Sequence, residues 1–175
     1  MNGTIKKLVA IPKKDALEIS KAVVVAKSEE GKARDFYQDN AEKTSDIEMK
    51  KAFGFLAKEE IEHFNALTSV ETALKENGKF AVVSDSALQH LERPAIYPEK
   101  GAKTDLSGDG ELAALLWAMR AETKAKNFYL AQAEKTKIKE ARAFWETLAE
   151  FEAEHFAYLD SLFSTWTDTQ DFIMG

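Results

Sequence analysis

Apolar and polar residues follow one another along most of this chain with the spacing of amphipathic helices. Apolar residues recur at steps of three and four positions, which places them on one face of an α-helix. The pattern fills two stretches without proline, 13–93 and 99–175, and proline is the residue that most strongly breaks a helix. We therefore predict an all-α protein built from long helices.

Turn signals divide each proline-free stretch into a pair of helices. We expect four helices, at about 13–44, 47–77, 111–136 and 139–166. Gly78 is expected to end the second helix as its C′ residue, and a short C-terminal tail, 166–174, is expected to fold back over the bundle. Strand-like alternation is confined to Phe80–Val83.

About 30 residues, 78–110, separate the two pairs of helices. Neighbouring helix ends in a bundle are usually joined by about 2–8 residues. A connection of this length can run along the bundle and reverse the second hairpin. We expect a single domain over 1–175, a four-helix bundle with a long crossover between helices two and three, and hairpins at about 13–77 and 111–166.

The two helical pairs repeat one another at a fixed offset of 92 residues. Residues 26–64 placed over 118–156 without a gap give 17 identities in 39 positions, far more than a shared composition explains. The longest identical run is Ala-Glu-Lys-Thr, at 41–44 and again at 133–136. The repeat predicts a duplicated helical hairpin, and its repeated polar residues become the first candidates for function.

Ionisable side chains recur on the inward helix faces, where apolar residues are expected. They are Glu30, Glu60, His63, Glu122, Glu152 and His155. Because a helix rises about 1.5 Å per residue, Glu30 lies roughly 21 Å before the first turn and Glu60 roughly 22 Å after it. Each Glu-x-x-His pair presents both side chains from one face of its helix, so the sequence predicts one buried cluster.

Two divalent metal ions would explain such a cluster. Four glutamates buried together without counter-charge would cost many kcal/mol, whereas two divalent cations cancel their charges and leave the histidines neutral. The chain has no cysteine, which excludes thiolate zinc sites and iron–sulfur centres. Oxygen and imidazole donors suit two iron ions, and manganese or zinc also accepts them.

Charge and hydropathy limit the expected partners. The 24 basic and 30 acidic side chains give a formal net charge of −6, and no basic stripe offsets it, so we expect no nucleic acid as a partner. The longest apolar runs are far shorter than the roughly 20 residues of a membrane span. We expect no membrane association and a cytoplasmic protein.

The set Glu30, Glu60-Ile-Glu-His63, Glu122 and Glu152-Ala-Glu-His155 resembles the ligands of the ferritin-like superfamily, nearest to its rubrerythrin-like and bacterioferritin-like branches. The resemblance extends over about 15–166. It implies a ferritin-like bundle in which Glu60 and Glu152 bridge two metal ions. Glu30 with His63, and Glu122 with His155, would then complete the shell of each ion.

The chain departs from those families in three features. Rubrerythrins typically carry a further carboxylate three residues after the first ligand of the third helix, where this chain has Ala125. They also carry a C-terminal rubredoxin domain, which needs cysteines that are absent here. Ile61 stands where bacterioferritin has its haem methionine. Metal binding therefore follows from the resemblance more directly than peroxidase activity does.

Tyr37 and Tyr129 are also repeated, seven residues after Glu30 and Glu122. This spacing places each tyrosine on the inward face, two turns along its helix. One interpretation is that the hydroxyls donate hydrogen bonds to a ligand carboxylate or to metal-bound oxygen. The other is that the rings only pack in the core.

Four further residues have weaker signals. Glu62 and Glu154 lie about 100° around the helix from the neighbouring histidines, which favours exposed salt bridges over metal delivery. His90 lies in the crossover, where a lone histidine is usually structural. Gly31, directly after Glu30, either opens access for an oxidant or relieves crowding.

The resemblance implies a non-haem di-iron oxidoreductase of rubrerythrin-like type. Such a protein oxidises a dinuclear ferrous site with hydrogen peroxide or dioxygen, in oxidative-stress defence or iron oxidation. An unidentified electron donor and a homodimer belong to the same expectation. Two alternatives stay open, namely a non-catalytic metal-binding or iron-handling protein and a di-iron oxygenase that acts on an organic substrate.

Overall fold

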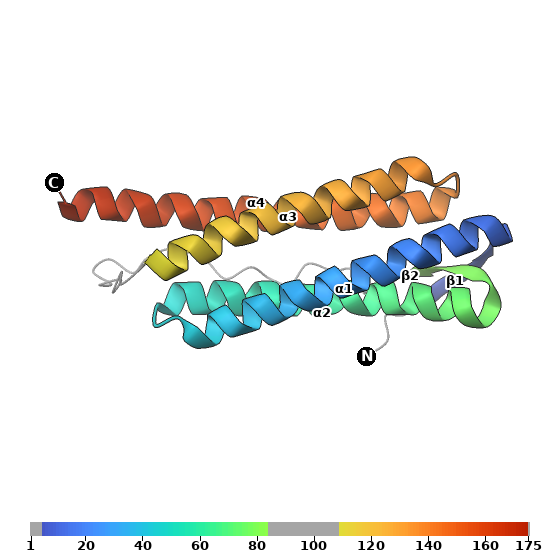
Figure 1. Ribbon diagram of the computed structural model, residues 1–175, viewed down its shortest axis with the longest axis horizontal. Coiled ribbons are helices and arrows are strands. Elements are labelled where there is room, and N and C mark those ends of the chain that lie inside the picture. The colour runs from blue at the N-terminus through green and yellow to red at the C-terminus, as the bar shows by residue number, and fades with distance from the viewer. Residues whose placement is uncertain (1–4, 84–108, 175) are drawn as a thin grey trace.

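Four long helices lie side by side in a bundle (Figure 1), and the prediction of a helical bundle is confirmed. The computed structural model describes residues 5–83 and 109–174, with only the backbone described for Asp109 and for residues 168–174. The helices are α1 (Lys13–Lys43), α2 (Ile47–Asn77), α3 (Asp109–Lys135) and α4 (Lys139–Met174). Two short strands, β1 (Ile5–Ala10) and β2 (Lys79–Val83), form an antiparallel sheet.

Local sequence fixes both ends of α2. The carboxylate of Asp46 accepts the backbone N–H groups of Glu48 and Met49 at 2.8 and 2.9 Å, which satisfies two donors that the first turn of a helix leaves unpaired. Gly78 follows the last turn with φ of 62°, a conformation that only glycine adopts readily. Its N–H donates to the carbonyl of Leu74 at 3.1 Å, so the predicted C′ glycine is confirmed.

Two sequence predictions are wrong at the ends of the chain. The sequence pattern does not predict β1, which pairs with β2, the one segment with a strand-like pattern. The sequence predicts that the tail at 166–174 folds back, but α4 continues as one helix to Met174. No glycine or proline occurs between Lys139 and Met174, so nothing in the local sequence ends the helix earlier.

The second hairpin is reversed relative to the first. α3 begins at the end of the bundle where α1 and α2 are joined (Figure 1), and Thr44 donates a hydrogen bond to Glu111 there at 2.5 Å. α2 and α3 therefore run in the same direction. Of the connection between them, only β2 is described, and residues 84–108 lie outside the described residues.

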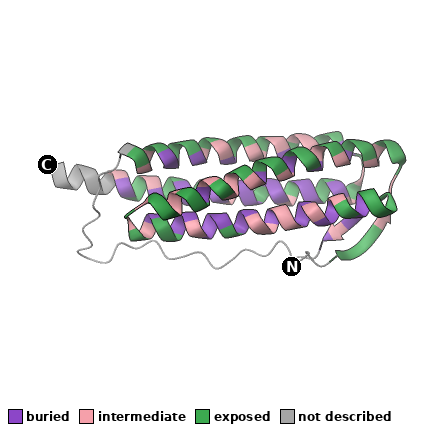
Figure 2. Cartoon of the chain, turned by 60° about the horizontal axis from the view of Figure 1, so that its bottom comes forward, coloured by how far each residue is buried: buried purple, intermediate pink, exposed green. Residues whose placement is uncertain are grey.

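Buried residues line the inner faces of the helices (Figure 2) and form two apolar clusters. The sheet-end cluster includes Ile19, Val23, Leu67, Val70, Phe80, Tyr129, Phe144, Trp145 and Leu148. The turn-end cluster includes Tyr37, Met49, Phe53, Leu56, Leu115, Leu159, Leu162 and Trp166. Along every helix the predicted polar ligands fall between these two sets, so a polar layer separates two apolar ones.

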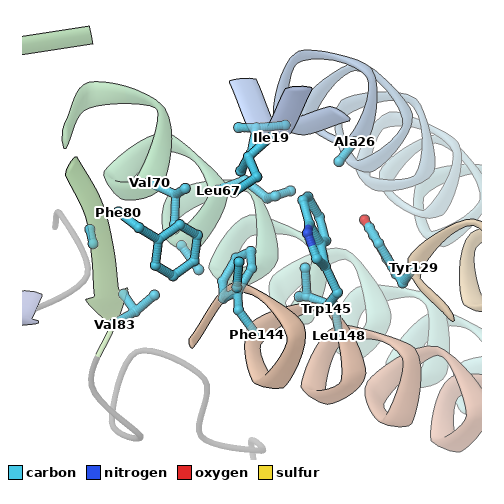
Figure 3. Packing of buried hydrophobic residues seen from close by; sticks show 14 of the residues in the cluster. Ile19, Ala26, Leu67, Val70, Phe80, Val83, Tyr129, Phe144, Trp145 and Leu148 are labelled. Atoms are coloured by element: carbon cyan, nitrogen blue, oxygen red, sulfur yellow. The ribbon is translucent and has the colours of Figure 1, made fainter. Parts of the chain in front are cut away.

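The sheet covers one end of the sheet-end cluster. Phe80 of β2 is fully buried and packs edge-on against Phe144 of α4, with ring centroids 6.0 Å apart (Figure 3). β1 lies outside β2 and leaves Ile5 and Leu8 exposed. Among the described residues, no helix has an apolar stretch long enough to cross a membrane.

Candidate metal centre

The middle layer of the bundle brings together all six predicted metal-ligating residues. Glu30 comes from α1, Glu60 and His63 from α2, Glu122 from α3, and Glu152 and His155 from α4. Each is no more than 3% exposed. Buried carboxylates are rare unless they are paired or bind a metal ion, so this layer is the outstanding chemical feature of the described residues.

The cluster divides into two half-sites. In the His63 half-site, Nδ1 of His63 lies 3.4 Å from one oxygen each of Glu30, Glu60 and Glu152. In the His155 half-site, Nδ1 of His155 lies 3.2 Å from Glu60, 3.8 Å from Glu122 and 3.5 Å from Glu152. Within each half-site the four donor atoms lie within 4.8 Å of one another.

Glu60 and Glu152 each belong to both half-sites. Oε2 of Glu60 faces His63 and Oε1 faces His155, while Oε1 of Glu152 faces His63 and Oε2 faces His155. The two imidazole rings are stacked with centroids 5.4 Å apart and an interplanar angle of 18°. This arrangement has the symmetry of the sequence repeat, because each half contributes one shared and one unshared glutamate.

The donor atoms fit a pair of metal ions. Five of them are buried without any hydrogen-bond partner, namely both oxygens of Glu60, Oε1 of Glu152 and Nδ1 of each histidine. A buried polar atom without a partner is costly. Atoms that share an ion at about 2.0–2.2 Å lie about 3–3.5 Å apart, close to the nitrogen–oxygen distances in both half-sites. These buried groups could hold metal ions.

The two repeated tyrosines reach across the bundle. The hydroxyl of Tyr37 on α1 donates to Oε1 of Glu122 on α3, and the hydroxyl of Tyr129 on α3 donates to Oε1 of Glu30 on α1. Each tyrosine therefore contacts the unshared glutamate of the opposite hairpin. Both rings are also buried in an apolar cluster, so each tyrosine packs in the core and donates a hydrogen bond to a glutamate of the cluster.

The contacts of the four buried carboxyl groups divide them into two kinds by the direction of their pKa shifts. Burial, followed by the charge of Glu60, raises the pKa of Glu30 well above its usual value, and burial with the charge of Glu152 does the same to Glu122. For Glu60 and Glu152, burial also acts to raise the pKa, but contacts with the histidines and with the unshared glutamates outweigh it. The pKa of Glu60 is lowered and that of Glu152 falls to about 2.

The histidines and tyrosines complete this distribution of charge. Burial alone would lower the pKa of His63 and His155, but the surrounding carboxylates outweigh it and raise both pKa values well above the usual range. Burial and a carboxylate neighbour raise the pKa of Tyr37 and Tyr129. Without metal, both histidines therefore hold an extra proton and Glu60 and Glu152 are ionised, while Glu30, Glu122 and both tyrosines stay neutral.

The remaining sequence candidates lie outside this cluster. Glu62 and Glu154 belong to neither half-site. Both are partly buried, so the prediction that they are exposed is wrong. A Cβ atom at Gly31 would meet nothing within 4 Å, so crowding does not explain that glycine. His90 lies outside the described residues.

Glu59 is a further functional candidate, which the sequence patterns do not reveal. Its side chain is 2% exposed, and its Oε2 lies 3.0 Å from Nε2 of His155, the ring nitrogen that faces away from the cluster. Glu59 precedes Glu60 on α2 and points toward α4. The repeat did not point to it, because the residue 92 positions later is Phe151 and not a glutamate.

Comparison with protein-family models, curated proteins and solved structures finds no match to this chain. The class that the structure itself defines is a four-helix protein with two buried Glu/His groups that could bind metal.

Proposed function

We propose that this protein is a non-haem di-iron oxidoreductase of rubrerythrin-like type, whose dinuclear ferrous site is oxidised by hydrogen peroxide or dioxygen. The observation that carries the proposal is the pair of half-sites that share Glu60 and Glu152, with five buried donor atoms that have no hydrogen-bond partner. The parallel direction of α2 and α3 supports it further, since ferritin-like bundles have a long crossover of that kind.

The six side chains would bind the metal ions in different ways. Glu60 and Glu152 would bridge them, Glu30 and His63 would complete one shell, and Glu122 and His155 the other. When bound, two ferrous ions supply the two electrons that, with two protons, reduce one hydrogen peroxide to two waters. The chain itself excludes bulk water from the layer.

The tyrosines would act by fixing the unshared carboxylates. A hydroxyl that donates to Glu122 or Glu30 restricts how that carboxylate rotates, and such outer contacts orient metal ligands. Their raised pKa values keep both hydroxyls protonated and able to donate. An external electron donor would return the site to the ferrous state, and a homodimer and a cytoplasmic location belong to the same proposal.

An anaerobic ferrous titration of the metal-free protein tests the proposal, followed by stopped-flow absorbance with peroxide and with dioxygen. We expect saturation at two irons per chain and fast oxidation, faster with peroxide for a rubrerythrin-like peroxidase. Faster reaction with dioxygen would favour a ferroxidase or an oxygenase. Two bound irons that react with neither would indicate a metal-binding or iron-handling protein, and no stoichiometric binding would refute the metal centre.

Replacing one bridging glutamate should remove a ligand from both metal positions. In Glu60→Ala both half-sites lose a donor, so we expect at most one tightly bound iron per chain and loss of oxidation. Glu62→Ala, two residues along the same helix, is the matched control and should retain two irons. Unchanged stoichiometry in Glu60→Ala, or an equal loss in Glu62→Ala, would contradict the assignment of the helix face.

A further inference from the structure

The two half-sites differ in what supports their histidines. Nε2 of His155 faces the carboxylate of Glu59 at 3.0 Å. At the matching position in the other hairpin the chain has Phe151, whose ring packs against His63 with centroids 5.0 Å apart and an interplanar angle of 58°. Within the part of the chain that the structure describes, no carboxylate faces Nε2 of His63. The repeat is therefore broken at the position that packs against the ring of each histidine.

The remaining parts of the two half-sites match each other. Each half-site has one histidine Nδ1, one unshared glutamate and one oxygen from each shared glutamate. Each unshared glutamate also accepts a hydrogen bond from a tyrosine of the opposite hairpin. The substitution of phenylalanine for glutamate is thus the main chemical difference between two otherwise equivalent metal positions.

A carboxylate can only accept the hydrogen bond from an imidazole N–H. Glu59 therefore holds the Nε2 proton of His155, so the proton that His155 gives up on metal binding is the one on Nδ1, whose lone pair then faces the cluster. A carboxylate behind a metal-binding histidine also makes the ring a stronger donor and holds its orientation, and the loss of such a partner typically weakens metal binding about 10–100-fold. The phenyl ring of Phe151 offers His63 packing but accepts no comparable hydrogen bond.

We propose that Glu59 is a positioning residue that makes the two metal positions unequal, so that the His155 half-site binds its ion first and the His63 half-site binds second. This inference rests on the proposed dinuclear metal function and adds an order of loading to it. The ion in the His63 half-site is then the more weakly held of the two, and it exchanges with solution more readily.

A titration with Co²⁺, followed by NMR of protein labelled with ¹⁵N-histidine, tests this order without any turnover. With one equivalent of Co²⁺, we expect paramagnetic shifts or broadening at the His155 ring in preference to the His63 ring, by about tenfold. The second equivalent should then affect His63. The proton on Nε2 of His155 should also exchange slowly with deuterated water, because a buried carboxylate holds it.

Variants at the two matching positions separate positioning from folding. Glu59→Leu should weaken binding at the His155 half-site about 10–100-fold and remove the preferred order. Glu59→Gln retains an acceptor oxygen of similar size and should restore part of the preference. Phe151→Leu is the matched control, since it changes the packing on His63 without adding or removing a carboxylate. Circular dichroism of the metal-free variants checks that each one folds.

The possible outcomes distinguish this inference from the function on which it rests. Equal loading of both half-sites in the unaltered protein, or an unchanged order in Glu59→Leu and Glu59→Gln, would overturn the role of Glu59 while leaving the dinuclear centre intact. Failure of the unaltered protein to bind two Co²⁺ ions would refute the metal centre itself. Loss of order in Glu59→Leu, its partial return in Glu59→Gln and its retention in Phe151→Leu would support the proposal.

Discussion

At the scale of single residues, Tyr37 and Tyr129 determine how firmly the unshared glutamates are held. In Tyr37→Phe, Glu122 loses its buried donor, which should lower the free energy of unfolding by about 1–3 kcal/mol. It should also weaken metal binding at least about tenfold, at the His155 half-site. Tyr129→Phe should do the same at the His63 half-site, because its partner is Glu30.

Urea unfolding of the metal-free variants and Co²⁺ titration measure these two effects separately. Phe36→Leu is a suitable control, since Phe36 packs edge-on against Tyr37 at 5.5 Å and has no polar group. It should lower stability without changing metal affinity. If each tyrosine variant weakened both half-sites equally, the crossed pairing of tyrosines and glutamates would be wrong as a description of function.

Some of these single-residue features could be predicted from the sequence and others could not. The six ligands were accessible because the repeat and the helical period each point to them independently. The hydrogen-bond partners of the tyrosines could not be predicted, because Tyr37 and Glu122 are 85 residues apart and meet only through the packing of α1 against α3. Glu59 was missed for a related reason, since a position one residue before a ligand faces inward only where a neighbouring helix approaches that side of α2.

At the scale of helices, three glycines show two different effects, namely the low helix propensity of glycine and its ability to adopt a positive φ. Gly31 and Gly54 lie inside α1 and α2, and an added Cβ would meet nothing within 4 Å at either. Alanine at each position should stabilise the protein by about 0.5–1 kcal/mol. Gly78 has equal space, but its φ of 62° disfavours alanine, so Gly78→Ala should destabilise by about 1–2 kcal/mol.

Urea unfolding of the three variants checks these opposite signs, and the rate of ferrous oxidation adds a functional readout. A Gly31→Ala variant that is more stable yet oxidises iron more slowly, with Gly54→Ala unaffected, would assign oxidant access to Gly31. Destabilisation by both interior substitutions would mean that the helices need these glycines for a reason other than space.

Helices were the most predictable elements, because their period, caps and breakers are local. α2 begins and ends at the predicted residues, and α1 differs at its end by one residue. The sheet was less predictable, since β1 gains its partner from residues about 70 positions away. Only β2 had a recognisable pattern, in which Phe80 and Val83 are buried.

At the scale of the whole molecule, the bundle holds a charged layer between two apolar clusters. Without metal, protons on four of its groups offset part of the negative charge of this layer, as the raised pKa values of His63, His155, Glu30 and Glu122 indicate. These four groups must lose their protons before they act as ligands. Metal binding and proton release are therefore one process in this protein.

Binding of two divalent ions at pH 7 should release about four protons per chain, one from each of His63, His155, Glu30 and Glu122. Because the metal-free state holds more protons than the loaded state, metal affinity should rise with pH and fall as the solution is acidified. With about two protons per ion, each apparent Kd should change about 100-fold per pH unit while these groups remain protonated.

An indicator dye in weakly buffered solution counts the protons during a Zn²⁺ titration, and Glu62→Gln should release the same number as the unaltered protein. Release of fewer than one proton per ion would show that these four groups do not hold their protons in the metal-free protein, and the buried carboxylates would then need another counter-charge.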